Sequence, residues 1–278
     1  MSIRDITVII TTFKSDDKIE QCLNSIDKQA KVILVENSDR NEFKKKIEEK
    51  FNNVNCILSG ANLGYGAGNN IGLKKALTKY ALILNPDATL HQSTLKNFFE
   101  ETKKTPNFAI MGPLTQDDQN ENKNLEKNKP LEVKNLKGFA MFLNLPEFKD
   151  IGFFDEDFFF YFEEIDLCKR VTKKKKKIYL LPSVKVHHDG GQSHKESINK
   201  EMELSRNWHW MWSTFNFHKK HKGFIVSFFI VLPKLSSAVI KVLIYSLLFN
   251  EKKNIYYQRM SGLVNAIAGK SSWYRPNV

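Results

Sequence analysis

Short apolar runs alternate with segments of helical spacing along the first third of the chain. Four of these runs are expected to form buried strands, at residues 6–11, 32–35, 54–58 and 80–84. Three helical patterns lie between them, at residues 19–26, 41–51 and 68–80. Strands that alternate with helices build α/β sheets, and such sheets bind ligands where their strands end. The pattern therefore predicts an α/β fold with a mostly parallel central sheet and a site at one edge. Two later strands are expected at residues 134–143 and 177–188.

The positive charge of the chain is concentrated near its end. The whole chain carries a net charge of +12 over 278 residues, yet residues 206–278 hold 11 Lys and Arg against a single acidic residue. The three cysteines lie far apart without a CxxC pair, which favours a reducing compartment and argues against a structural zinc site. The first apolar run has no flanking features of a signal peptide and is expected to be a strand.

Residues after 205 differ in character from the rest. Three tryptophans and a basic cluster at 218–222 precede an apolar stretch at 224–249, which Pro233, Lys234 and Lys241 interrupt. This combination favours a pair of amphipathic helices lying on an anionic membrane surface, with a buried helical hairpin as the alternative. Binding of nucleic acid is not expected, because the apolar pattern fits lipid better. We expect a domain at residues 1–222 and a basic, membrane-associating helical tail at residues 223–278.

Two motifs follow predicted strands. The glycine-rich loop at 62–70 allows close approach to a phosphate at a helix N-terminus, although it is equally typical of a plain turn with a helix start. Asn85-Pro86-Asp87 ends a buried strand, so Asp87 is presented at the sheet edge, where a carboxylate can hold Mg²⁺. A simple Pro-Asp turn is the alternative.

Two further motifs lie later in the chain. His188 shares a strand face with two valines and precedes a Gly-Gly pair, so it is a candidate metal ligand or a partly buried structural histidine. The run at residues 152–170 places acidic residues among phenylalanines before a helical pattern. A carboxylate there is either part of a helix start or a general base held in a cleft.

The order of these motifs resembles a known family. ITVIITTFKS, ILVENSD, NLGYGAGNN, LILNPDA, GFFDEDFFFYFEEIDLCKR and VHHDGGQS occur in the order found in inverting family 2 glycosyltransferases of the GT-A fold. The resemblance covers roughly residues 5–222, and within the family it is strongest to the rhamnosyltransferase-type branch that builds bacterial surface polysaccharides.

The resemblance implies a nucleotide site at the ends of the first strands. Thr11, Thr12 and Phe13 would line the base and ribose of the nucleotide. Glu36 stands where the family usually has Asp and would hold the base or ribose. Residues that match the family's loop around the nucleotide are Asn62, Gly64 and Asn70.

The resemblance also implies a metal site and a base. Asn85 replaces the first Asp of the family's D-x-D motif and would belong to the nucleotide-sugar site. Asp87 would bind a divalent metal, Mg²⁺ or Mn²⁺, with His188 as a further ligand and His187 in reserve.

The Glu163–Glu164 pair falls on the family's E-D motif. Glu164 therefore matches the catalytic base, with Glu where Asp is usual.

These residues imply a metal-dependent inverting glycosyltransferase. It would move a sugar from a nucleoside-diphosphate sugar, with dTDP-rhamnose as one candidate, to a polyprenyl-linked or glycan acceptor. It would act in the cytoplasm, at the inner face of the cell membrane. The alternative is a catalytically silent protein that binds a nucleotide sugar or a polyanion, because Glu36, Asn85 and Glu164 depart from the family's usual residues.

Overall fold

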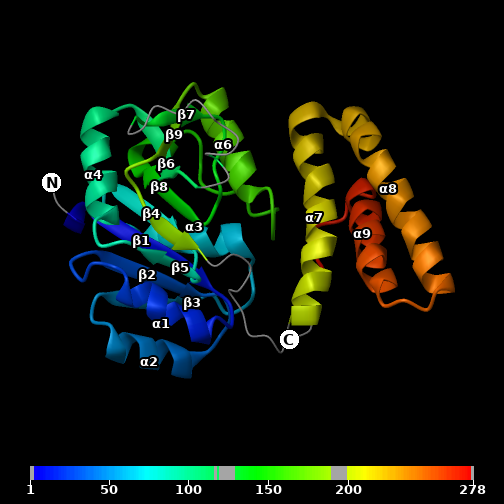
Figure 1. The fold of residues 1–278 in the computed structure, drawn as a ribbon, viewed down its shortest axis with the longest axis horizontal. Coiled ribbons are helices and arrows are strands. Elements are labelled where there is room, and N and C mark those ends of the chain that lie inside the picture. Colours follow the sequence, from blue (N-terminus) through cyan, green and yellow to red (C-terminus); the bar gives the residue numbers. More distant parts are fainter. Residues whose placement is uncertain (1–2, 116–117, 119–128, 189–198, 277–278) are drawn as a thin grey trace. The chain divides into compact units, whose positions relative to one another are not determined.

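The chain forms two compact units. A computed structural model describes residues 3–115, 118, 129–188 and 199–276 (Figure 1). The first unit, here the sheet unit, comprises Met1–Phe154 and Glu164–Lys195; the second, the helical unit, comprises Asp155–Glu163 and Glu196–Val278. The predicted division at residue 222 falls at the end of a helix inside the helical unit.

The sheet unit is built on an eight-stranded sheet with the order β3-β2-β1-β4-β8-β6-β9-β7. Its strands are β1 (Ile6–Thr12), β2 (Lys31–Glu36), β3 (Val54–Leu58), β4 (Tyr80–Leu84), β6 (Phe108–Pro113), β7 (Leu131–Val133), β8 (Ala140–Asn144) and β9 (Lys177–Leu181). β3, β2, β1 and β4 are parallel neighbours, whereas β8 is antiparallel to both β4 and β6. The expected mostly parallel α/β sheet is confirmed.

Helices and a small second sheet complete this unit. β5 (Ala88–Leu90) pairs antiparallel with β10 (Val186–His188). The helices are η1 (Ile3–Asp5), α1 (Asp16–Asn24), α2 (Asn41–Lys50), α3 (Tyr65–Lys75), α4 (Thr94–Lys104), η2 (Leu145–Phe148) and α6 (Glu163–Lys173). The first residue of α6, Glu163, is also the last residue of the segment Asp155–Glu163, which belongs to the helical unit.

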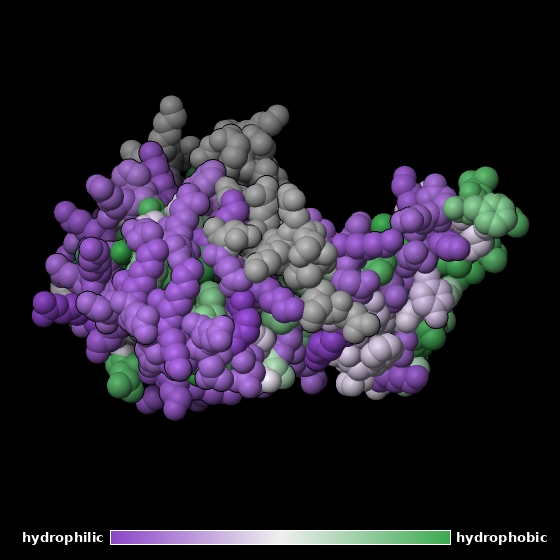
Figure 2. All heavy atoms as spheres, turned by 90° about the horizontal axis from the view of Figure 1, so that it is seen from below, coloured by the Kyte–Doolittle hydropathy of each residue, from purple (hydrophilic) through white to green (hydrophobic). Residues whose placement is uncertain are grey.

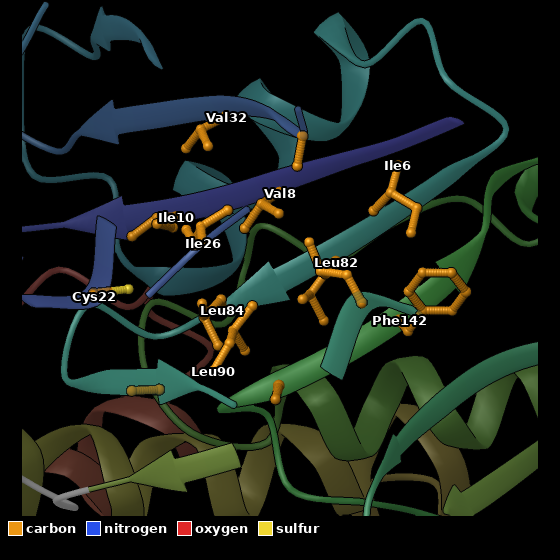
Figure 3. Packing of buried hydrophobic residues seen from close by; sticks show 14 of the residues in the cluster. Ile6, Val8, Ile10, Cys22, Ile26, Val32, Leu82, Leu84, Leu90 and Phe142 are labelled. Atoms are coloured by element: carbon orange, nitrogen blue, oxygen red, sulfur yellow. The ribbon is translucent and has the colours of Figure 1, made fainter. Parts of the chain in front are cut away.

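The sheet has an apolar core on each face, because successive side chains of a strand point to opposite sides. Val8 and Ile10 of β1 pack with Leu82 and Phe142 against Cys22 of α1 (Figure 3). Ile9, between them in sequence, joins the other core, which includes side chains of α3 and α6. Helices therefore cover both faces and leave the strand ends open to carry polar groups.

Three predicted elements have different bounds in the structure. The helix expected at 68–80 is α3, which starts at Tyr65 and stops at Lys75, and Leu77 is exposed rather than buried. The strand expected at 134–143 is β8, which begins only at Ala140, and residues 134–139 are not part of a strand. The strand expected at 177–188 is divided into β9 and β10, which belong to different sheets.

The helical unit contains three helices and the aromatic segment before α6. Its helices are α7 (Asn199–Lys222), α8 (Phe224–Leu247) and α9 (Lys252–Ile267). The apolar stretch at 224–249 forms one helix, because α8 runs through Pro233 without a break, and α9 is the second helix of the tail. A proline removes one backbone hydrogen bond and can bend a helix without ending it.

Most apolar side chains of α8 point away from the rest of its unit. Ser227, Val231 and Ala238 are buried, whereas Ile225 and Leu243 are exposed. The remaining exposed apolar residues in and directly after α8 are Phe224, Val226, Phe229, Leu232, Val239, Ile240, Ile244, Leu247, Leu248 and Phe249. Hydrophobic side chains accordingly gather on the surface of the C-terminal helices (Figure 2). Among the described residues α8 is the one helix that, by length and composition alone, could cross a membrane.

Candidate active site

Candidate residues of the sheet unit lie where β1, β2 and β4 end. The register aligns Thr12 with Glu36 at the ends of β1 and β2. Asn85 and Asp87 follow β4 directly, and β4 runs parallel to β1 on its other side. The carboxyl ends of parallel strands share one edge of a sheet. The sheet therefore brings these side chains to a common edge.

Asp87 and His188 form the polar centre of this edge. The Asp87 side chain is 1% exposed, and its Oδ1 lies 3.3 Å from His188 Nε2. Asn85 Nδ2 lies 3.3 Å from the same ring nitrogen. β5 and β10 create this approach, because their antiparallel register places His188 opposite Ala88. Three side chains named from the sequence are thus in contact.

The imidazole of His188 is held by an aromatic ring. The Phe139 ring is stacked on it, with centroids 4.5 Å apart and planes 7° from parallel. The backbone carbonyl of Phe139 also accepts a hydrogen bond of 2.9 Å from the backbone N–H of Asn85. His187 is exposed and pairs with Thr89 in the register. Of the two histidines, His188 is the one that faces Asp87.

The chemistry of this cluster fits a divalent cation. Asn85 Oδ1 and Asp87 Oδ1 are buried, and neither has a hydrogen-bond partner within the described residues. A buried oxygen left without a partner is unfavourable, and a bound cation would satisfy it. Carboxylate and amide oxygens suit Mg²⁺ and Mn²⁺, and an imidazole suits transition metals.

The protein would supply only part of a coordination shell. Within the described residues there is no group of three or more His, Cys, Asp or Glu side chains that could hold a metal. The nearby Cys22 Sγ donates to the carbonyl of Asn85 at 3.6 Å. Burial and the charge of Asp87 raise the pKa of this thiol, so it stays protonated. Oxygens of a ligand and water would have to complete the shell.

The glycine-rich loop is organised by an asparagine that the sequence reasoning missed. Asn37, the residue after β2, donates to Asn62 Oδ1 at 3.2 Å and to the carbonyl of Gly64 at 3.0 Å. Its own Oδ1 accepts from the backbone N–H of Leu63 at 3.0 Å. Gly64 precedes α3 with φ of 88°, a conformation that favours glycine. Asn37 directly follows Glu36 in a motif at the end of a strand, and this position was the signal by which the sequence could have revealed it.

Thr12 and Phe13 close the end of β1. Thr12 is fully buried, and its Oγ1 has no hydrogen-bond partner among the residues described. The Phe13 ring is partly exposed, with the ammonium of Lys14 5.9 Å from its centroid. These two residues leave one hydroxyl and one ring face for a ligand.

Glu36 is engaged within the protein. It is fully buried, and Arg40 donates to both of its oxygens, at 3.0 and 2.9 Å. Arg40 also forms a bidentate pair with Asp16, at 2.7 and 3.0 Å. Arg40 therefore holds the Glu36 carboxylate in place, and the role of Glu36 toward the base or ribose stays a prediction.

Asn70 is also engaged within the protein. Its Nδ2 donates to the carbonyl of Phe154 at 2.9 Å, and its Oδ1 accepts from the backbone N–H of Phe154 at 3.0 Å. Both groups of the amide are used, and the residue is buried. Asn70 thus fixes the chain just before the aromatic segment, whereas the sequence placed it against the nucleotide.

Glu164 lies near the start of α6 and faces the backbone at Gly138. A Cβ at Gly138 would lie 3.5 Å from both Cβ and Cγ of Glu164. The buried Oε2 of Glu164 has no hydrogen-bond partner in the part of the chain that the structure describes. Burial raises the pKa of this carboxyl above its ordinary value, and the backbone N–H groups of Glu164 and Ile165 oppose this shift. Glu163 beside it is buried, whereas Glu164 as a whole residue is half-buried.

A cavity of 960 Å³ opens beside Glu164. It lies between the segment after β7, α6 and the start of β9. Its charged lining includes Glu164 together with Lys134, Lys137, Lys175, Lys176 and Lys177. The Gly138–Phe139 backbone connects this cavity to the metal-type cluster, because Gly138 contacts Glu164 and Phe139 stacks on His188.

A family model described as "Glycosyl transferase family 2" matches residues 7–170, more than half of the chain. The chain belongs to glycosyl transferase family 2. The resemblance inferred from the motif order is therefore confirmed, and the match includes the strand ends, the Asn85–Asp87 turn and the Glu163–Glu164 pair.

Two curated proteins show similarity to this family 2 chain. The low-salt glycan biosynthesis hexosyltransferase Agl10 of Haloferax volcanii is 27% identical over 61% of this chain and 62% of its own length. The chain thus spans less than two thirds of that relative. The N-acetylglucosaminyl-diphospho-decaprenol L-rhamnosyltransferase of Mycobacterium tuberculosis is 20% identical over 67% of this chain and 76% of its own length.

A solved structure shares the fold of this family 2 chain. It is the mannosyltransferase PcManGT from Pyrobaculum calidifontis, in complex with GDP-Man and Mn²⁺, with a TM-score of 0.60 and 13% identity. The alignment covers 97% of this chain and 87% of that protein. This likeness confirms the GT-A fold.

Close packing of α3 on β1 gives a testable prediction for the nucleotide edge. A Cβ at Gly68 would lie 2.5 Å from Cγ2 of Thr11, whose Oγ1 donates to Asn69 at 3.1 Å. We expect Gly68→Ala to reduce the free energy of unfolding by about 1–3 kcal/mol, because the side chain must be forced aside. Urea denaturation measures this loss.

The matched control removes the methyl group that clashes. Thr11→Ser deletes Cγ2 and keeps the hydroxyl, so the double variant Thr11→Ser/Gly68→Ala should recover most of the lost stability. Equal losses in the single and double variants would show that the contact with Thr11 is not the cause.

Proposed function

We propose that the protein transfers a sugar from a nucleoside-diphosphate sugar to a lipid-linked or glycan acceptor, with inversion, in surface polysaccharide synthesis. The observation that carries this proposal is two buried oxygens beside His188 in a family 2 chain. They are Asn85 Oδ1 and Asp87 Oδ1, which have no hydrogen-bond partner among the described residues. dTDP-rhamnose is the first donor to test, since one relative is named as an L-rhamnosyltransferase.

On the donor side, Asp87 and His188 would hold Mg²⁺ or Mn²⁺. The metal, when bound, would supply Lewis-acid neutralisation of the charge on the departing diphosphate. Asn85 would face the same metal through its Oδ1, which has no hydrogen-bond partner among the described residues. Thr12 Oγ1 and the Phe13 ring would line the nucleoside, and the loop at Asn62 and Gly64, fixed by Asn37, would approach its phosphates.

On the acceptor side, Glu164 would take the proton from the attacking hydroxyl. In-line displacement at an anomeric carbon needs a base on the face opposite the departing diphosphate, and a carboxylate can fill that role. A pKa raised by burial makes Glu164 a stronger base than an exposed glutamate. Its unpaired Oε2 is available for the hydroxyl.

The helical unit would hold the protein at the inner face of the cell membrane, where a polyprenyl-linked acceptor is located. This part of the proposal is supported by the exposed apolar side chains of α8 and by the basic cluster that ends α7. Apolar burial and attraction to anionic lipid act together in interfacial helices. The localisation proposed is therefore cytoplasmic and peripheral.

A donor screen tests the function. The purified protein is incubated with dTDP-, UDP- and GDP-sugars, Mn²⁺ or Mg²⁺ and a polyprenyl-diphosphate-linked sugar, and the extended lipid is detected by mass spectrometry. We expect transfer from one donor, and loss of transfer on addition of EDTA. Binding of a nucleoside diphosphate without transfer from any donor would reject the enzyme and favour the silent binding protein.

A further inference from the structure

The helical unit contains a cavity of 530 Å³ that has no role in the proposed chemistry of the sheet edge. Its walls are the segment 156–159, the second half of α7, the end of α9 and the residues that follow α9. All of these residues belong to the helical unit. The cavity is therefore defined within one compact body.

Three cationic side chains line this cavity: Lys219, Lys270 and Arg275. Within the described residues, none of them forms an ion pair with a carboxylate. The Arg275 guanidinium donates through Nη1 to two backbone carbonyls, those of Ser272 at 2.7 Å and Tyr274 at 2.9 Å. Burial lowers the pKa of Arg275, which means that its charge is partly removed from water. A desolvated guanidinium is the group best suited to bind a phosphate oxygen.

Aromatic rings and a buried histidine hold Arg275 and its neighbours in place. The guanidinium carbon of Arg275 lies 3.7 Å from the centroid of the Phe159 ring. His209 Nε2 lies 2.8 Å from the carbonyl of Tyr274, and its Nδ1 lies 3.0 Å from Ser272 Oγ. Burial lowers the pKa of His209 to about 3, so the imidazole stays neutral at physiological pH and both of its contacts are kept. The Arg275 guanidinium is thus pre-organised, whereas Lys219 and Lys270 are exposed.

The cavity also offers groups that suit a sugar. Trp273 is 53% exposed and presents an indole face, while its Nε1 donates to Asn265 at 3.2 Å. Glu156 and Asp157 on the opposite segment are exposed carboxylates that can accept hydrogen bonds from hydroxyls. Cations, an exposed indole and carboxylates in one cavity match a phosphorylated sugar better than a bare phosphate.

We propose that this cavity is a docking site for the sugar-diphosphate headgroup of the lipid-linked acceptor, occupied before the acceptor hydroxyl reaches Glu164. The diphosphate would lie against Arg275 and Lys270, and the sugar against Trp273. The inference rests on the proposed function for the identity of the ligand, and it adds a second site, separate from the donor edge. The exposed apolar side chains of α8 belong to the same unit and offer a surface for the isoprenoid chain.

Direct binding to the intact protein tests this assignment. The probe is farnesyl diphosphate, measured by calorimetry without any donor, for the wild type and for Lys270→Ala/Arg275→Gln. We expect the Kd of farnesyl diphosphate to rise about tenfold or more in the double variant, because two charge-assisted contacts are lost. The Kd of UDP with Mn²⁺ should stay unchanged, since the donor edge belongs to the sheet unit.

A matched control separates this site from general charge. Lys252→Ala/Lys253→Ala removes the same number of charges from the exposed start of α9, outside the cavity lining. It should leave the Kd of farnesyl diphosphate unchanged. Equal weakening in both double variants, or no binding by the wild type, would overturn the proposal.

A second arm distinguishes the acceptor from ordinary phospholipid. Flotation with phosphatidylglycerol vesicles should be the same in the wild type and in Lys270→Ala/Arg275→Gln. If flotation were lost while farnesyl diphosphate binding was kept, the ligand would be a phospholipid headgroup and the proposal would be wrong. A wild type that binds farnesyl diphosphate through these residues but transfers no sugar would reject the proposed function and leave the cavity assignment standing.

Discussion

Replacement of Asp87 by alanine is expected to reduce sugar transfer about a thousandfold, since a metal ion at a departing diphosphate contributes several kcal/mol of transition-state stabilisation. The Asp87 side chain is 1% exposed, and its Oδ1 faces His188 without a hydrogen bond. Initial rates with a saturating donor and a titration of Mn²⁺ measure the effect. His188→Ala should cause a smaller loss and raise the Mn²⁺ concentration needed for half-maximal rate.

Thermal denaturation separates this role from a role in folding. Mn²⁺ should raise the melting temperature of the wild type, because a ligand that binds only the folded state stabilises it, and it should not raise that of Asp87→Ala. In EDTA the variant should be at least as stable as the wild type, since a buried carboxylate has been removed. Asp150→Ala, an exposed aspartate of the same unit, is the control. If Mn²⁺ raised the melting temperature of Asp87→Ala as much as that of the wild type, Asp87 would not be a metal ligand.

The sequence allowed the first strands of the sheet to be predicted because their apolar runs are short and are bounded by turns. It failed where backbone geometry decides an element's end. α3 starts three residues before the predicted helix because Gly64 adopts a positive φ and lets the chain turn into the helix early. Leu77, which falls within the predicted helix, lies after the end of α3 and is 95% exposed. Pro233 interrupts the apolar stretch in the sequence, yet α8 continues past it as one helix.

The strand-end residues of the candidate site could be located from the sequence, but their partners could not. Motif order placed Asp87 and His188 together, and the structure brings them within 3.3 Å. The motif could not reveal that Glu36 is paired with Arg40, because that contact depends on how the loop after β2 folds. It also missed Asn37, whose three hydrogen bonds to the glycine-rich loop join segments about 25 residues apart.

Glu164→Gln is expected to lower transfer by about 10²–10⁴-fold, the usual contribution of a general base. Glutamine keeps the size and the hydrogen-bonding shape of the side chain but cannot accept the proton. Initial rates measure the loss. The matched control in the same unit is Glu147→Gln, since Glu147 lies on η2 and pairs with Lys176. Glu164→Asp should retain part of the activity, because it keeps the carboxylate and shortens its reach by one methylene.

The pH dependence of stability distinguishes a base from a helix cap. Burial raises the pKa of Glu164 in the folded protein above the value of 4.5 expected in the unfolded chain. Such a group stabilises the fold fully below the unfolded pKa, and this stabilisation is lost as pH rises through the folded pKa. At pH 8, well above the unfolded pKa, the wild type has lost part of this stabilisation, and Glu164→Gln should therefore melt at a higher temperature. The difference should shrink toward pH 4.

A carboxylate that acted mainly as a helix start would behave in the opposite way. Negative charge near a helix N-terminus stabilises by about 0.3–1 kcal/mol, so its removal would lower the melting temperature at pH 8. The backbone N–H groups of Glu164 and Ile165 do favour the ionised form, but burial is the larger influence on the pKa. A variant that loses transfer and gains stability at pH 8 thus identifies Glu164 as a group placed for chemistry at a cost in folding free energy. A variant that loses both would assign it to the structure of α6.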